Sequence, residues 1–389
     1  MILAFGILLV AINLRPALAG VGPLVEDIRR STGLSNSVLG MLTTLPLLAF
    51  GIVSTLTPAA TKKFGVPATL AISMVLLTLG ILVRGIPWLP ALFTGTLVAG
   101  VAIAVGNVLL PTVTKQKFPE HSGLMTSLYS SGIGLGAALA AGVSVPLATT
   151  LQLGWRGSLS AWAVPALIAC AFWVTQLRHS ETKPMNRSFT ASLRHLGRSK
   201  LAWSVALFMG FQSLTFYVVL AWLPAVLTSR GAEESYAGWM LSLSQATGIV
   251  GSLIIPTVAD RWSHQQAFVW CLTVLEVVAL AGLFAAVDSL SIVCIVLLGF
   301  VLGGSFGLSL LFIVLRASDT QSATELSGMA QSIGYLVAAS GPTIFGGLYD
   351  WTAGWDWPFG FLFAVAAIKL LVGLKAGADA VVESPESIQ

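Results

Sequence analysis

Arg15 is the residue whose type and position most directly suggest chemistry. It lies within a long apolar segment, directly before Pro16. A charge at the centre of a membrane span costs about 2.5 to 3.5 kcal/mol on insertion scales, so it should face water, a ligand or a counter-ion. A guanidinium presents a planar fork of donors that matches carboxylate, cyanate or nitro oxygens. We therefore expect Arg15 to bind a solute; the alternative is a structural arginine bonded to helix carbonyls or to an acidic neighbour.

Glu276 is an acidic residue near the middle of another apolar segment, 265–287. A carboxyl group at that depth could couple transport to protons, or it could be the counter-ion of Arg15. A third interpretation is an interhelical hydrogen bond or a protonated acid, because burial in hydrocarbon favours the neutral form.

Further candidates for solute binding are uncharged side chains in the apolar segments. The polar candidates are Asn13, Thr43, Thr44, Asn107, Gln212, Gln245, Ser305 and Gln331, and the aromatic candidates are Tyr129, Phe211, Phe216, Tyr217 and Tyr335. An interhelical hydrogen bond is the competing interpretation for each polar side chain. Plain packing is the competing interpretation for each ring.

The sequence gives little support to an enzyme, a metal site or a nucleotide site. The four histidines fall in or beside loops without a nucleophile or metal-ligand spacing, and the three cysteines lie singly in apolar segments. The string Gly132-x-Gly134-x-Gly136 follows no strand, and there is no P-loop. We expect no catalytic activity, no metal, no cofactor and no nucleic-acid partner.

Composition indicates that these residues sit in a bundle of membrane helices. The 389 residues are 56% hydrophobic and 9% charged, whereas soluble domains carry roughly a quarter charged residues. A spanning helix needs about 20 apolar residues. The sequence offers twelve such runs, at 3–25, 36–60, 67–86, 90–114, 123–149, 158–177, 201–228, 235–259, 265–287, 290–315, 325–349 and 357–375. We predict an all-α polytopic membrane protein with twelve transmembrane helices.

The distribution of basic residues predicts the orientation of these spans. One set of alternate loops holds fourteen Lys and Arg residues, among them Lys62, Arg187 and Lys369, while the other holds five, among them Arg84. Cytoplasmic loops retain the excess of basic residues. Both termini and the central polar segment are therefore expected in the cytoplasm.

Two similar halves follow from three paired motifs. The string Pro58-Ala-Ala-Thr-Lys-Lys-Phe64 matches Pro256-Thr-Val-Ala-Asp-Arg-Trp262, and Ser122-Gly123 matches Ser327-Gly328. Gly154-Trp155-Arg156 matches Gly354-Trp355-Asp356 at nearly the same displacement. We predict a six-helix bundle at 1–177, a cytoplasmic linker at 178–200, a second six-helix bundle at 201–375 and a cytoplasmic tail at 376–389.

This organisation resembles the major facilitator superfamily over nearly the whole chain. The resemblance implies two bundles around a central cavity and places Asn13, Asn107, Gln212 and Ser305 on cavity-facing spans. It places Glu276 on a peripheral span, which favours the interhelical hydrogen bond or the neutral acid. It also implies a gating role for the loop at Asp260-Arg261, whereas Lys62 departs from the acidic pattern in the equivalent first-half loop.

Shorter motifs resemble the cyanate permease (CynX/NimT) family. They are Asn13-Leu14-Arg15-Pro16, Gly22-Pro23-Leu24, Leu42-Thr43-Thr44-Leu45-Pro46, Gly106-Asn107-Val-Leu-Leu-Pro111 and Ala221-Trp222-Leu223-Pro224. That resemblance implies transport of small anionic or polar nitrogen compounds, such as cyanate or nitroimidazoles.

We therefore expect a monomeric secondary transporter in the bacterial inner membrane. Its solute would be cyanate-like, a nitro compound or a small carboxylate, moved by its own gradient or with protons. The alternative within transport is a proton-coupled drug exporter, whose cationic solutes would prefer an acidic cavity residue. The competing class, a membrane sensor, usually needs a signalling domain, for which the central segment and the tail leave no room.

Overall fold

The computed structural model describes residues 2–34, 36–177, 196–285 and 288–382. Within these ranges the chain is helical, apart from one isolated bridge between Ala317 and Val382. Most of the predicted linker (178–195) and the end of the predicted tail (383–389) lie outside the described residues. The helical architecture confirms the predicted fold class.

The first bundle opens with an interrupted span. This span consists of α1 (Ile2–Asn13), α2 (Pro16–Ala19) and a 3-10 turn, η1 (Gly22–Leu24), and it leads into α3 (Val25–Thr32). The bundle continues with α4 (Asn36–Phe64), α5 (Val66–Arg84), α6 (Leu89–Lys117), η2 (Pro119–His121), α7 (Ser122–Thr149), α8 (Gly154–Ala161) and α9 (Ala163–Gln176).

The second bundle contains six long helices. They are α11 (Lys200–Thr228), α12 (Glu234–Ala259), α13 (Gln266–Phe284), α14 (Asp288–Leu315), α15 (Thr320–Thr352) and α16 (Asp356–Ala376). Ser199 caps α11 by accepting from the Ala202 N–H at 3.2 Å, and Asp319 caps α15 by accepting from the Ser322 N–H at 2.8 Å. These caps fix where the two helices begin.

Among the described residues, eleven segments are long and apolar enough to cross a membrane. The long helix outside this set is α15, expected as the eleventh span at 325–349. It has 33 residues, so it extends about 50 Å and exceeds the roughly 30 Å hydrocarbon core. Its Ser, Thr and Gln residues lower its hydropathy. Since α15 packs against α4, α6 and α11, much of this polar surface faces protein.

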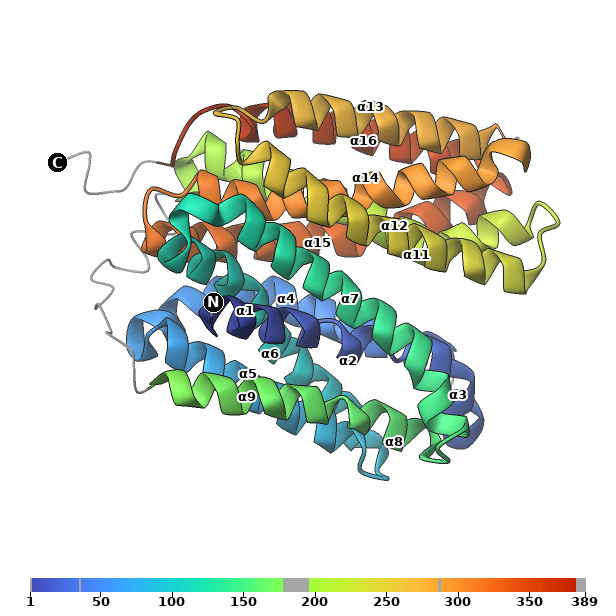
Figure 1. Ribbon diagram of the computed structural model, residues 1–389. Helices are drawn as coiled ribbons and strands as arrows, with labels where there is room; N and C mark the ends of the chain where they lie inside the picture. Colours follow the sequence, from blue (N-terminus) through green and yellow to red (C-terminus); the bar gives the residue numbers. More distant parts are fainter. Residues whose placement is uncertain (1, 35, 178–195, 286–287, 383–389) are drawn as a thin grey trace.

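The two bundles meet along two helix pairs. Helix α4 packs on α15, and α7 packs on α12 (Figure 1). We call the end of the molecule at which α9 ends and α11 begins the linker side, and the other end the opposite side. In Figure 1 the linker side is at the left, and α7 and α12 lie together there and separate toward the right.

Glycines let helices within the second bundle approach backbone to backbone. A Cβ on Gly303 of α14 would lie 1.8 Å from the Gly248 carbonyl oxygen of α12, and one on Gly251 would lie 2.0 Å from the Phe300 carbonyl oxygen. Such contacts require the absence of a side chain and are typical of membrane helix pairs.

Arg316 ties the C-terminal segment to the linker side. Its Nε donates to the Ala376 carbonyl at 2.9 Å, and its own carbonyl accepts from the Val382 N–H at 2.8 Å. Burial lowers the pKa of Arg316, and the nearby Asp379 opposes that shift. The first residues of the predicted tail are thus packed against the second bundle.

Candidate functional site

Proline creates the break that exposes Arg15. Pro16 has no N–H to donate to the Ile12 carbonyl, so a regular helix cannot pass through this point. Helix α1 ends at Asn13, and the chain resumes as α2 from Pro16. Arg15 therefore lies between two helix segments.

Two glycines allow neighbouring helices to pack directly on the break. A Cβ on Gly136 of α7 would lie 2.1 Å from the Ile12 carbonyl oxygen, and one on Gly106 of α6 would lie 2.6 Å from Leu14 Cδ2. The break is thus enclosed by α6 and α7, with Leu14 fully buried.

The Arg15 side chain crosses from the first bundle to the second. Its Nη1 donates to the hydroxyl oxygen of Tyr217 on α11 at 2.9 Å, and its Cζ lies 6.0 Å from the centre of the Phe306 ring on α14. Tyr335 of α15 is close enough to interact electrostatically with its charge. Of the described residues, none places a carboxylate against Arg15. The guanidinium is therefore surrounded by neutral aromatic residues.

Further aromatic rings pack beside the tyrosine and phenylalanine side chains around Arg15. Phe216 and Tyr217 meet edge to face with centroids 5.3 Å apart, and Tyr335 lies 4.9 Å from Phe50 of α4. Tyr217, an aromatic candidate from the sequence, and Phe306, which sequence analysis missed, make the direct contacts to Arg15. The position of Phe306 directly after Ser305 was the available signal.

Amide and hydroxyl groups line the contact between the bundles near Arg15. Gln331 Nε2 of α15 donates to the Asn107 carbonyl of α6 at 3.5 Å. The Asn107 Nδ2 and Gln331 Oε1 atoms are buried without a hydrogen-bond partner. Such groups normally pair with a ligand, water or protein.

A second polar cluster lies between α11 and α14. Gln212 Nε2 donates to Ser213 Oγ at 2.7 Å, while Gln212 Oε1 and Ser305 Oγ are buried without a partner. Ser309, one turn after Ser305, donates to Met209 Sδ at 3.0 Å. Gln212 and Ser305 are thus held inside the second bundle, on the helices that carry Tyr217 and Phe306.

Asn13 faces away from Arg15. Its Nδ2 donates to the Leu9 carbonyl at 2.8 Å and to the Pro165 carbonyl of α9 at 3.1 Å. These bonds point Asn13 toward α9, whereas the Arg15 side chain reaches α11 and α14 of the second bundle. Asn13 therefore bonds within the first bundle.

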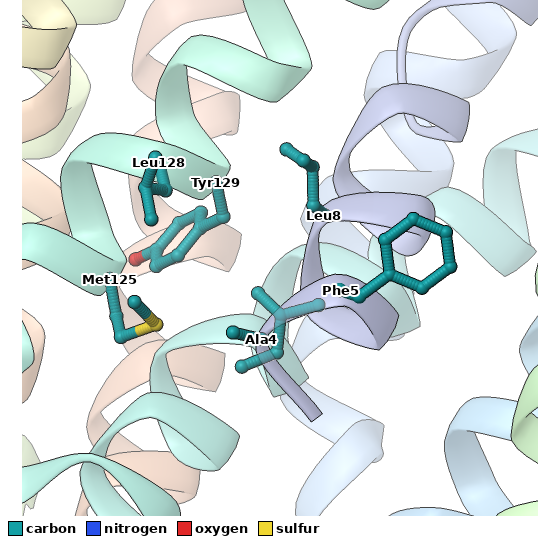
Figure 2. Close-up of a pocket in the computed structure, with 7 residues that line it drawn as sticks. Ala4, Phe5, Leu8, Met125, Leu128 and Tyr129 are labelled. Atoms are coloured by element: carbon teal, nitrogen blue, oxygen red, sulfur yellow. The ribbon is translucent and has the colours of Figure 1, made fainter. Parts of the chain in front are cut away.

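Tyr129 also lies apart from Arg15. It lines a cavity of about 150 Å³ between α1 and α7, together with apolar side chains that include Leu8 and Met125. Figure 2 shows its ring on the α7 side of this cavity, opposite α1. The cavity is apolar and is separate from the cluster around Arg15.

Thr44 and Gln245 lie where the bundles diverge. On α4, Thr44 and Leu48 share a face with Gly51 and Thr55, by spacings of three and four residues. Gly51 and Thr55 bond to Ser332 of α15, and nearer the start of α4 the Thr44 and Leu48 side chains of the same face are exposed. This face is thus in contact with α15 on the linker side and more exposed toward the opposite side.

The same pattern holds on α12. Gln245 precedes Ile249 and Ser252 on one face and is half-buried. Ser252 accepts through its carbonyl from Ser130 of α7 at 3.2 Å, and the Ile249 carbonyl accepts from Ser131 at 3.4 Å. Gln245 continues this contact face toward the opposite side.

Asp260 joins the bundles at the linker side. Its carboxylate accepts from the Gly123 N–H at 2.9 Å and from Ser122 Oγ at 3.1 Å. These groups form the first turn of α7, where the helix dipole favours an anion. Arg261 is exposed beside this contact.

Glu276 has a partner that excludes it as the counter-ion of Arg15. On α13, its Oε2 accepts from Lys369 Nζ of α16, and both side chains are buried. Sequence analysis counted Lys369 with the loop residues, which was wrong. The interhelical hydrogen bond expected for Glu276 is present, but it belongs to an ion pair.

The described part of the chain contains no group of three His, Cys, Asp or Glu residues that could hold a metal ion. The chemistry available at Arg15 is therefore that of a fixed cation, aromatic faces and amide groups.

Comparison with known proteins agrees with this geometry. The family model described as Major Facilitator Superfamily matches residues 3–342. The uncharacterized transporter YycB of Bacillus subtilis is 41% identical over 375 residues, covering 96% of this chain and 93% of that protein. The 2-nitroimidazole transporter of Escherichia coli is 38% identical over 381 residues, covering 97% and 96%. The cyanate transport protein CynX of Escherichia coli is 28% identical over 362 residues, covering 92% and 93%.

A solved structure supports the fold. The proton:xylose symporter XylE superposes with a TM-score of 0.79 over 99% of this chain and 98% of that chain, at 16% identity. At that identity the likeness concerns the fold alone. Together with the family match and the relatives, it establishes that the chain belongs to the Major Facilitator Superfamily, among the relatives of the 2-nitroimidazole and cyanate transporters.

Proposed function

We propose that this chain is a secondary transporter of a small anionic or polar nitrogen-containing solute, which binds Arg15 between the two bundles and crosses by alternating access. The observation that carries the proposal is the surroundings of Arg15. Its guanidinium lies between the bundles against a tyrosine hydroxyl and a phenylalanine ring. A cation so placed has donors to offer to an incoming anion.

The class of solute follows from the groups around this cation. Carboxylate, cyanate and nitro oxygens match the planar guanidinium fork, and the rings of Tyr217 and Phe306 suit a flat, delocalised molecule. Buried amide atoms on Asn107 and Gln331 supply further hydrogen bonds. The printed names of two relatives, a 2-nitroimidazole transporter and a cyanate transport protein, support the same class.

A drug exporter for cationic solutes is the less favoured function. A cationic solute needs a carboxylate in the cavity. Glu276, an acid within a span of the second bundle, is already paired with Lys369 away from Arg15.

We infer that the structure represents an outward-facing state. The excess of Lys and Arg in the linker-side loops supports a cytoplasmic location for that side. The bundles bond to each other there through Asp260, Ser252 and Ser332, and residues of the same faces nearer the opposite side, Thr44, Leu48 and Gln245, are exposed or half-buried. Solute would then reach Arg15 from outside the cell.

The remaining parts of the proposal concern organisation. We propose that a monomer in the bacterial inner membrane carries out transport, with protons as a candidate coupling ion. Residues 1–177 and 201–375 would be the two moving bundles, joined by 178–200 and followed by 376–389.

Binding measured on purified Arg15 variants tests the function. Loss of one charge-assisted hydrogen bond weakens binding by about 1.5 to 3 kcal/mol, roughly ten- to a hundredfold. Arg15→Gln should lose that much affinity for 2-nitroimidazole or cyanate, and Arg15→Lys should also bind weakly because it lacks the planar fork. Lys63→Gln, which removes an exposed cation, is the matched control.

Uptake into proteoliposomes, with and without a pH gradient, complements the binding data. A panel of nitroimidazoles, cyanate and small carboxylates should include a transported solute whose uptake depends on Arg15. Wild-type affinity in both monodisperse Arg15 variants would remove Arg15 from the site and overturn the proposal.

A further inference from the structure

Arg84 is a buried cation that the transport site does not use directly. Sequence analysis counted it with loop residues, but it lies in the last turn of α5 with 1% of its surface exposed. Its Nη1 donates to the Ala17 carbonyl of α2 at 2.5 Å, while Nε and Nη2 have no hydrogen-bond partner. Within the described residues, no carboxylate pairs with it.

The Ala17 carbonyl needs this donor because α2 is short. In a continuous helix the Val21 N–H would donate to Ala17, but here it donates to the Leu18 carbonyl at 3.2 Å. Arginine side chains satisfy carbonyls at helix ends and interact favourably with the helix dipole. Arg84 thus caps the segment that begins directly after Arg15.

The Arg84 side chain is held in place by close packing. A Cβ on Gly95 of α6 would lie 2.7 Å from Arg84 Cγ, so α6 covers the stem of the side chain. A buried charge without an ionic partner is expensive, and an apolar side chain of similar volume would often be more stable. Packing alone therefore does not explain an arginine at this position, which implies a role for its charge.

The two flanks of Arg15 are anchored to different helices. On the α1 side, Asn13 bonds to the Pro165 carbonyl of α9. On the α2 side, Arg84 bonds to the Ala17 carbonyl from α5. Arg15 and Pro16 lie between these two anchors.

We propose that Arg84 is a positioning residue for Arg15: its bond to Ala17 fixes α2 and so holds the Arg15 guanidinium toward Tyr217 and the solute. This inference rests on the proposed function of Arg15 as the solute-binding cation. Arg84 contacts no solute itself and acts through the backbone of the break.

Hydrogen exchange tests the anchoring step without a ligand. In Arg84→Gln, the backbone amides of residues 17–21 should exchange about tenfold faster, since loss of a hydrogen bond to a charged group lowers the free energy of local opening. The matched control is Thr78→Val, whose buried hydroxyl on the same helix bonds only within α5, to the Met74 carbonyl. Unchanged exchange at 17–21 in Arg84→Gln would overturn the proposal.

A double-mutant cycle tests the link to Arg15, with 2-nitroimidazole and cyanate as probes. Arg84→Gln should weaken binding about tenfold, and the double variant Arg15→Gln/Arg84→Gln should bind no more weakly than Arg15→Gln alone. Losses that multiply would mean that Arg84 acts independently of Arg15, which would overturn the proposal.

Two further outcomes keep this test separate from that of the proposed function. Wild-type affinity in Arg15→Gln would count against the proposed function, while the exchange at 17–21 would still decide the anchoring role of Arg84. If Arg84→Gln does not fold, Arg84→Lys replaces it, and exchange and affinity must still change together. A change in affinity without a change in exchange at 17–21 would reject the positioning role.

Discussion

Lys369 and Glu276 form an ion pair that joins α16 to α13 inside the second bundle. Lys369 Nζ donates to Glu276 Oε2, and both residues are fully buried. The second carboxylate oxygen has no recorded partner. Two opposite charges that neutralise each other can remain within the membrane, whereas either charge alone would be unfavourable.

Removing one member of this pair should therefore damage the protein more than removing both. Glu276→Gln or Lys369→Met should each lower the free energy of unfolding by about 3 to 5 kcal/mol, because the other group is left buried and unpaired. The double variant Glu276→Gln/Lys369→Met should recover most of that loss. Thermal unfolding of the three variants in detergent measures the effect.

Transport by the double variant decides between structure and coupling. If the pair only holds α13 to α16, the folded double variant should retain uptake and its dependence on a pH gradient. A well-folded double variant that no longer responds to the gradient would instead make the pair part of proton coupling.

The sequence predicted which segments carry charge but not the partners of each side chain. Arg15 stood out because a lone charge in an apolar segment is rare, and Pro16 marked the break beside it. Its partner Tyr217 lies far away in the sequence, so no local pattern connects the two. Lys369 was misplaced because basic residues near span ends usually belong to loops.

The sequence also could not predict the direction in which each side chain points from its helix. Neighbouring helical residues point about 100° apart, so span boundaries uncertain by two residues leave the facing side undetermined. Asn13 and Tyr129 lie at suitable depth but point to α9 and α1 respectively, away from Arg15. The number and order of the spans depend on where apolar runs occur along the sequence. That prediction needs no knowledge of side-chain direction and was therefore easier.

Backbone contact between α12 and α14 predicts a strong effect of a single methyl group. In Gly303→Ala, the new Cβ would lie 1.8 Å from the Gly248 carbonyl oxygen, which forces the helices apart. Overpacking of this kind lowers stability by about 1 to 3 kcal/mol. Gly360→Ala in α16 is the control, since nothing lies within 4 Å of its Cβ position. Thermal unfolding of both variants checks the prediction; equal melting temperatures would contradict the close contact.

The charge distribution predicts that both termini lie in the cytoplasm. Reporter proteins that are active in only one compartment, fused after Gln389 or inserted near Arg187, should both report cytoplasm. Removing Lys369 from the loop count leaves the excess on the linker side intact. An external signal from either fusion would invert the orientation and turn the open side toward the cell interior.

Asp260 should control how tightly the linker side is closed. Its carboxylate accepts from the Gly123 N–H and from Ser122 Oγ across the two bundles, and Asp260→Ala removes both bonds. Hydrogen bonds to a charged group contribute about 1.5 to 3 kcal/mol each, so the closed state should become at least about tenfold less favoured.

The readout is the rate of maleimide labelling of Ser130→Cys in a cysteine-free background, because Ser130 is buried between α7 and α12 in this state. Labelling should accelerate in Asp260→Ala but not in Glu233→Gln, which changes an exposed carboxylate that forms no cap at the start of α12. Equal labelling rates in the two variants would show that the bonds of Asp260 do not hold the bundles together.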